Sequence, residues 1–393
     1  MPASRLSGAA LALWATAVQL AASPVAAASA GRLSMQPQRL RVADPPKIGA
    51  TVSGVQQDYS PASTSTSARY LVASFPKLKQ VAYVHLPDNV WRPLVIGNVS
   101  EPGAVATDST NRRLFVADPP NQVIWWYHLT KGPAGLLETT GERAVAVANC
   151  TASWMSANGV GDLYFIGRKT GADRESVFRQ TAGHIGVGGT VDPTEIFSRS
   201  NSGSPNAMAW APAGLAVDAF HVYWGNEANG TVHGSIVQAP RHDSGTVAQD
   251  SELKTLNSDF SEVRGMTVTG THVFWVAPDG VHGMRKGMSD APQGMVAAAP
   301  GGGDGAWMPK SIAFDGDASL YFTEQDAGVL YQIPAQNLNT HELTKFVDAP
   351  NVDSLSVLEL FQARGTSGAT RGASRTGAAL LVACAALATW AGA

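Results

Sequence analysis

The stretch Leu215-Ala216-Val217-Asp218, followed by His221-Val222-Tyr223-Trp224, contains the pattern that decides the fold. A short apolar run ends in Asp, and a second run with an aliphatic, aromatic and apolar order begins after a short turn. Val and aromatic side chains favour strands, and two such runs joined by turn residues are typical of a β-hairpin. The second run returns as His272-Val273-Phe274-Trp275. The chain therefore contains a repeated hairpin unit.

The aromatic run recurs at a regular interval along the chain. Its copies are Tyr70-Leu71-Val72, Leu114-Phe115-Val116, Leu163-Tyr164-Phe165, Val222-Tyr223-Trp224, Val273-Phe274-Trp275 and Leu320-Tyr321-Phe322. From Leu71 to Tyr321 the period averages 50 residues. This is the length of a four-stranded propeller blade. The sequence predicts an all-β fold, a six-bladed β-propeller over residues 68–360.

The first copy lacks an innermost strand before Ala68, whereas the run Asp353 to Leu358 has no second strand after it. We expect this C-terminal strand to complete blade one, because ring closure removes the open sheet edge of a linear array.

With these blade phrases, the chain resembles six-bladed propellers of the YWTD, NHL and SMP-30/gluconolactonase (TolB-like) type. The resemblance implies a site at the mouth of the central channel, where the loops leading into the innermost strands converge. In the gluconolactonase-like group, acidic and amide side chains there hold a divalent metal that activates water or a lactone carbonyl.

Counting along the blades places the expected mouth positions near Glu101, Ser153, Pro212, Arg264, Lys310, Asn351 and Asp353. Glu101, Asn351 and Asp353 could coordinate a divalent cation such as Ca²⁺. Arg264 and Lys310 would oppose a cation and favour an anionic ligand. We therefore expect a binding module without a cofactor, whose partner is an extracellular protein, a carbohydrate or a small anionic ligand. The alternative is a metal-dependent hydrolase that uses the three cation ligands.

Other polar residues follow the repeat. His221 and His272 precede the aromatic run, and His233 and His282 follow it; repeat duplication explains them better than metal binding. Asp108, Asp218 and Asp315 end apolar runs before turns, where Asp caps backbone donors. Their sequence context predicts structural roles.

Composition excludes several classes of protein. The chain has 393 residues, of which 44% are hydrophobic and 15% are charged, which excludes disorder as the main state. Its 28 basic and 31 acidic residues leave no footprint for nucleic acid. Only Cys150 and Cys384 are present, so no disulfide framework can form, and Cys150 is expected to be a buried, inert thiol.

The two ends carry targeting patterns. Residues 1–30 resemble a cleaved signal peptide, and residues 31–67 a poorly ordered arm. Residues 361–376 form a small and polar linker before an apolar tail at 377–393, which is the pattern of a glycosylphosphatidylinositol (GPI) signal with Ser367 as the preferred attachment site. A retained membrane helix is the alternative.

The N-glycosylation sequons begin at Asn98, Asn149 and Asn229. Together with the two ends, they predict a glycoprotein of the secretory pathway. We expect it on the extracellular face of the plasma membrane, held there by a lipid anchor, or secreted.

Overall fold

The structure is a computed structural model, which describes residues 67–86, 88–132, 135–186, 192–197, 211–227, 234–241, 253–260, 262–287, 292–300, 307–335 and 339–360. The predicted signal peptide, linker, tail and anchor residue Ser367 lie outside these residues, as do Asn229 and nearly all of the predicted arm. Among the described residues, no helix is long and apolar enough to cross a bilayer.

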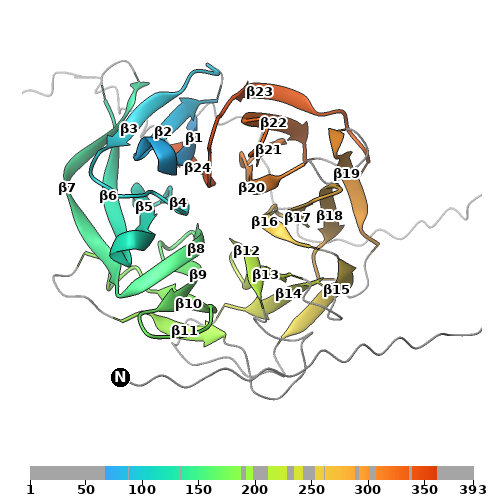
Figure 1. The fold of residues 1–393 in the computed structure, drawn as a ribbon, viewed down its shortest axis with the longest axis horizontal. Coiled ribbons are helices and arrows are strands. Elements are labelled where there is room, and N and C mark those ends of the chain that lie inside the picture. The colour runs from blue at the N-terminus through green and yellow to red at the C-terminus, as the bar shows by residue number, and fades with distance from the viewer. Residues whose placement is uncertain are drawn as a thin grey trace, which may run out of the picture. The chain divides into compact units, whose positions relative to one another are not determined.

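The fold is a six-bladed β-propeller, as predicted (Figure 1). Each blade is an antiparallel sheet of four strands. From the innermost strand outward, blade one contains β24 (Leu355–Leu360), β1 (Ala68–Phe75), β2 (Gln80–His85) and β3 (Arg92–Ile96); blade two β4 (Val105–Asp108), β5 (Arg113–Asp118), β6 (Val123–Lys131) and β7 (Leu137–Ala148); blade three β8 (Cys150–Ala157), β9 (Leu163–Lys169), β10 (Ser176–Gln180) and β11 (Thr194–Phe197). In the same order, blade four contains β12 (Pro212–Val217), β13 (His221–Asn226), β14 (Gly234–Pro240) and β15 (Lys254–Phe260); blade five β16 (Arg264–Val268), β17 (His272–Ala277), β18 (Gly280–Arg285) and β19 (Gly294–Ala298); blade six β20 (Pro309–Phe314), β21 (Ser319–Glu324), β22 (Val329–Pro334) and β23 (Thr344–Asp348).

The innermost strands form a closed ring. Contacts join β4 to β8, β8 to β12, β12 to β16 and β16 to β20, and β24 then contacts both β20 and β4. Figure 1 shows these six strands around a common centre.

The C-terminal strand completes blade one, which confirms the predicted closure. β24 pairs antiparallel with β1, and Leu358 lies opposite Tyr70. The strand runs from Leu355 to Leu360 rather than from Asp353 to Leu358. The two preceding residues hold the strand in place instead: the Asp353 N–H donates to Ser74 O at 3.0 Å, and the Ser354 N–H donates to Ser74 Oγ at 3.2 Å.

Aromatic side chains from the second strands fill the spaces between blades. Trp224 and Trp275 are fully buried. Trp224 stacks on Phe197 of blade three with a centroid distance of 4.8 Å. Tyr223 of the same run instead joins a cluster with Trp275 of blade five. The repeated aromatic run therefore supplies the interblade core on both faces of its sheet.

The hairpin of β6 and β7 braces the closing blade. The hydroxyl of Tyr70 in β1 donates to Gly135 O at 2.8 Å, and the Leu137 N–H donates to the hydroxyl of Tyr83 in β2 at 3.0 Å. The 12-residue strand β7 extends far enough for its start to reach blade one.

Candidate functional site

A central channel runs between the innermost strands and contains a cavity of about 170 Å³. All six innermost strands contribute to its wall. None of these lining residues is charged, and the polar side chains among them are Thr107, Ser156, Thr267 and Ser356. Charged groups that could bind a ligand lie instead at the ends of the channel.

The mouth face is the end of the ring at which the chain runs into each innermost strand. Pro212 and Arg264 are the first residues of β12 and β16, and Lys310 is the second residue of β20. Ser153 instead lies inside β8, where its hydroxyl donates to Glu175 Oε1 at 3.0 Å.

The mouth face contains a pocket of about 380 Å³ between blades six, one and two, which we call the mouth pocket. It is lined by Pro76, Lys77, Glu101, Gln325, Asp326, Asn351 and Asp353. Three of the predicted ligand residues, Glu101, Asn351 and Asp353, therefore lie in one pocket although they are far apart in sequence. That they bind a ligand stays a prediction.

The two predicted cations at the mouth each have an acidic partner. Lys310 Nζ forms an ion pair with Asp353 Oδ1, which joins blade six to blade one. Arg264 Nε donates to Glu262 Oε1 at 2.6 Å, and its Nη1 lies 3.4 Å from Met308 Sδ. The pairing offsets the positive charge on which the expectation of an anionic ligand depended. The sequence could not show it for Lys310, whose partner is 43 residues away.

The mouth pocket is acidic. Its lining residues carry the carboxylates of Glu101, Asp326 and Asp353 and the ammonium group of Lys77. Lys310 offsets the charge of Asp353, so the excess negative charge comes from Glu101 and Asp326. Elsewhere on the mouth face, burial and then the negative charge of Glu262 raise the pKa of Glu227. This charge distribution suits a ligand with positive charge or with several hydrogen-bond donors.

Two buried carboxylates hold the pocket walls, and the sequence analysis missed both. Asp118 accepts the Ser100 N–H at 3.2 Å and the Glu101 N–H at 3.3 Å. Glu324 accepts the N–H groups of Met308 and Asp326, each at 3.1 Å. Asp118 and Glu324 end the equivalent strands β5 and β21, four residues after the Leu that opens each aromatic run. This shared position in the repeat is the sequence signal that could have identified the two carboxylates.

A divalent cation fits the mouth pocket poorly. Asp353 is engaged by Lys310, so one of the three proposed ligands already faces a positive charge. A calcium ion takes six to eight oxygen ligands. Among the described residues, no three His, Cys, Asp or Glu side chains gather in an arrangement that could hold a metal ion.

On the opposite face, the Asp residues cap turns as predicted. Asp108 Oδ1 accepts the Asn111 N–H at 3.0 Å. Asp315 Oδ1 accepts three N–H groups, including that of Ser319. In blade five, Thr269 caps the turn in place of an Asp, and its Oγ1 accepts the His272 N–H at 3.0 Å.

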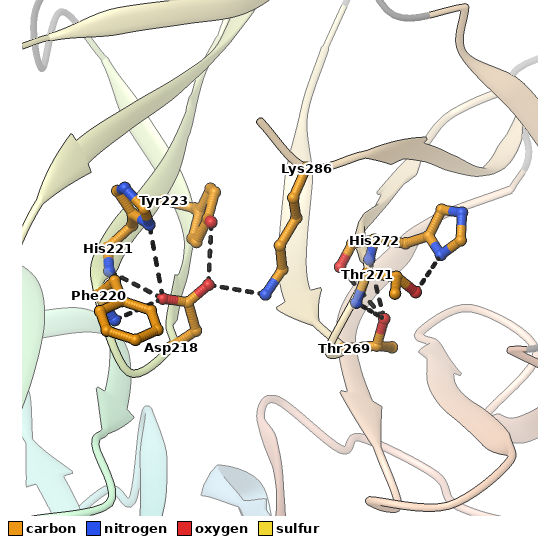
Figure 2. Close-up of polar contacts among 8 residues, drawn as sticks. All are labelled: Asp218, Phe220, His221, Tyr223, Thr269, Thr271, His272 and Lys286. Atoms are coloured by element: carbon orange, nitrogen blue, oxygen red, sulfur yellow. Dashed lines mark hydrogen bonds and ion pairs between the residues drawn. The ribbon is translucent and has the colours of Figure 1, made fainter. Parts of the chain in front are cut away.

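Figure 2 shows that Asp218 also joins two blades. Its Oδ1 accepts the Phe220 and His221 N–H groups, while its Oδ2 accepts the Tyr223 hydroxyl at 2.9 Å and Lys286 Nζ of blade five at 2.7 Å. Burial alone would raise the pKa of Asp218, but the hydrogen bonds from Lys286 and the two N–H groups outweigh burial and lower it. The Tyr223 hydroxyl has a raised pKa, first from burial and then from the Asp218 charge. The cluster therefore has a structural role: it joins blades four and five, and the charges of Asp218 and Lys286 offset each other.

The three matched histidines that the structure describes each have a local partner. His221 Nδ1 lies 3.8 Å from Asp218 Oδ1, and His272 Nδ1 lies 2.8 Å from Thr271 Oγ1 (Figure 2). His282 Nε2 lies 2.8 Å from Asp279 Oδ1. His233 lies outside the described residues. Each described histidine therefore has a polar neighbour nearby in sequence, and the explanation by repeat duplication stays a prediction.

Two of the predicted sequon asparagines, Asn98 and Asn149, are exposed. Cys150, which follows Asn149, is buried, and burial raises the pKa of its thiol to about 11. Such a thiol is protonated at neutral pH, as expected of an inert cysteine.

No family model matches the sequence, and no curated protein matches it. The structure is similar to a chain in a crystal structure of a nidogen/laminin complex, with a TM-score of 0.53 and 12% identity over 74% of this chain and 98% of that one. It is also similar to a gluconolactonase from Xanthomonas campestris (TM-score 0.44, 13% identity, 69% and 87% covered). A third similar structure is that of regucalcin, a calcium-binding protein from Agrobacterium tumefaciens (TM-score 0.42, 11% identity over 63% of this chain and 74% of that one). At these identities the likeness shows the propeller fold alone.

Proposed function

We propose that this propeller is a binding module that receives a basic side chain of an extracellular protein in its mouth pocket. The observation that carries the proposal is the acidic pocket between blades six, one and two. Asp118 and Glu324 hold its walls through backbone hydrogen bonds, so the pocket is formed before a partner arrives. A preformed pocket costs less ordering entropy when it binds.

The kind of partner follows from charge and from size. A Lys or Arg side chain can donate to Glu101 and Asp326, whereas an anionic group would face the net negative charge of the lining residues. A pocket of about 380 Å³ has room for one such side chain with its neighbours. The nidogen/laminin structure is compatible with this proposal, because the propeller fold occurs there in a complex between proteins.

The proposed location is the outer face of the plasma membrane. The signal peptide at 1–30 would direct the chain into the secretory pathway, and Ser367 would receive the GPI anchor as the residues after it, including the tail at 377–393, are removed. The propeller would then present its partner site outside the cell.

The proposal is tested on cells that display the full chain. A fluorescent arginine-rich peptide should bind these cells saturably, more weakly at high salt, while a glutamate-rich peptide of equal length should not bind. Glu101→Gln and Asp326→Asn should each weaken binding, and Glu142→Gln on the exposed edge strand β7 is the matched control. Equal binding of both peptides, or equal binding by all variants, would contradict the proposal.

The same protein should be assayed for hydrolysis of lactones with and without a chelator. Lactone hydrolysis that the chelator abolishes would favour the alternative, a metal-dependent hydrolase. The ion pair between Lys310 and Asp353 is the reason that we rank this alternative second.

A further inference from the structure

Two large apolar side chains are exposed beside the mouth pocket. Leu78 is 56% exposed and Ile96 is 64% exposed. Leu78 ends the short helix η1 (Pro76–Leu78), and Ile96 ends β3. The Gly97 N–H donates to Lys79 O at 3.2 Å, which joins the two segments. These two exposed apolar side chains therefore lie on joined segments, and a group that covered both would remove their surface from water.

The sequon of Asn98 lies at this spot. Asn98 is exposed, whereas the next residue, Val99, is buried. Ser100 is fixed by two contacts: its N–H donates to Asp118 Oδ2 at 3.2 Å, and its Oγ accepts Asn121 Nδ2 at 2.8 Å. The backbone around Asn98 is therefore held while Asn98 itself faces solvent.

We propose that Asn98 carries an N-linked glycan whose first sugars cover Leu78 and Ile96 and form the outer rim of the mouth pocket. In the transfer, Asn98 Nδ2 bonds to C1 of the first sugar of a lipid-linked oligosaccharide pyrophosphate. The bond between C1 and the pyrophosphate oxygen breaks, its electron pair leaves with the lipid pyrophosphate, and the amide releases one proton. The inference rests on the proposed passage through the secretory pathway.

The position of Asn98 links the glycan to ligand access. Glu101, three residues later, lines the mouth pocket, and so does Lys77, which precedes Leu78 in η1. A glycan between these two walls narrows the approach from the blade-one side. The pocket then admits a projecting side chain or a thin segment more readily than a broad protein surface.

Asn149 provides an internal control. It lies between β7 and β8, its carbonyl accepts the Thr170 N–H at 2.8 Å, and it is exposed. Its chain neighbours Ala148 and Cys150 are not among the exposed large hydrophobic residues. A glycan at Asn149 would therefore start between blades two and three, away from the segments that carry Leu78 and Ile96.

The test uses the full chain made in eukaryotic secretory cells. Peptide mapping after enzymatic deglycosylation should show Asn98 converted to Asp, as expected of an occupied site.

The second measurement is the shielding of Lys77 by the glycan. Acetylation of Lys77 by an activated ester should be several-fold faster in Asn98→Gln than in the wild type. Lys345, whose side chain is 55% exposed on blade six, is the reference lysine. Ser100→Thr, which keeps the sequon, and Asn149→Gln should leave the acetylation rate of Lys77 unchanged.

Two results would overturn the inference and leave the proposed function intact: an unmodified Asn98 in a chain glycosylated at Asn149, or an occupied Asn98 with the same acetylation rate of Lys77 in wild type and Asn98→Gln. Retention of the chain inside the cell with none of the three sequons modified would contradict the proposed location, and this inference with it.

Discussion

Ser354 accepts a hydrogen bond at its Oγ from the backbone N–H of Val105, 3.1 Å away, although 249 residues separate the two. Ser356, two residues after Ser354, makes the same kind of contact: its Oγ accepts the Thr107 N–H at 3.0 Å. On the other side, the Leu355 N–H donates to Ser311 Oγ at 2.9 Å. Hydroxyl groups therefore satisfy backbone donors that face a neighbouring blade and have no ladder partner there. They attach the closing strand to both of its neighbours.

Replacing Ser354 with Ala should lower the free energy of unfolding by about 1–3 kcal/mol, because the Val105 N–H loses its partner in a buried place. Thr140→Ala, at an exposed position of β7, should change it by less than about 0.5 kcal/mol. Urea denaturation followed by tryptophan fluorescence measures both. Equal midpoints for the two variants would show that the Ser354 contact does not hold the closing strand.

A chain that ends at Asp348 should melt at a lower temperature or aggregate, because it lacks β24 and leaves the edge of β1 unpaired. It also loses the buried side chains of Leu355, Leu358 and Leu360. A chain that ends at Gly365 keeps these residues and is the control. If both chains are equally stable and monomeric, β24 does not close the ring.

The blade pattern was readable from the sequence because it is local. Each aromatic run lies in a strand that packs between blades, so the period and the strand type predicted the architecture and even the origin of the closing strand. The pairing of Lys310 with Asp353 was not readable, since it depends on how two blades meet. The hydrogen bond between Ser354 and Val105 could not be predicted for the same reason. Glu101, Asn351 and Asp353 could be placed near one mouth because their positions in the repeat correspond.

Acid should destabilise the protein partly through Asp162. Burial alone would raise the pKa of Asp162, but the Ala182 N–H and Arg179, 2.7 Å from its Oδ2, outweigh burial and lower it. A carboxyl group with a lower pKa in the folded state stabilises the fold above its unfolded pKa of about 3.9, and this contribution is lost as the pH falls through the folded pKa.

Asp162→Asn should therefore lower the free energy of unfolding at neutral pH by about 1.5–3 kcal/mol, since it removes a charge-assisted hydrogen bond. Its urea midpoint should also fall less than that of the wild type below about pH 4. Parallel pH profiles for the two proteins would assign the acid sensitivity to other carboxylates.

The anchor prediction concerns the chain end. Phosphatidylinositol-specific phospholipase C should release the mature protein from cells, because it cuts the lipid from the anchor and leaves the anchor glycan on Ser367 or a neighbouring small residue. Peptides from residues 377–393 in the mature surface protein would contradict the anchor and support a retained membrane helix.

Hydrogen exchange of the purified full chain, with and without an arginine-rich peptide, tests most directly whether the mouth pocket is one binding site. We expect the peptide to slow exchange in three separate segments at once, around Lys77, Glu101 to Gly103 and Gln325 to Asp326. Asp326→Asn should weaken all three effects together. The opposite-face turn from Asp218 to His221 should exchange at the same rate in both samples. Protection at that turn alone, or in one of the three segments without the other two, would contradict a binding site at the channel mouth.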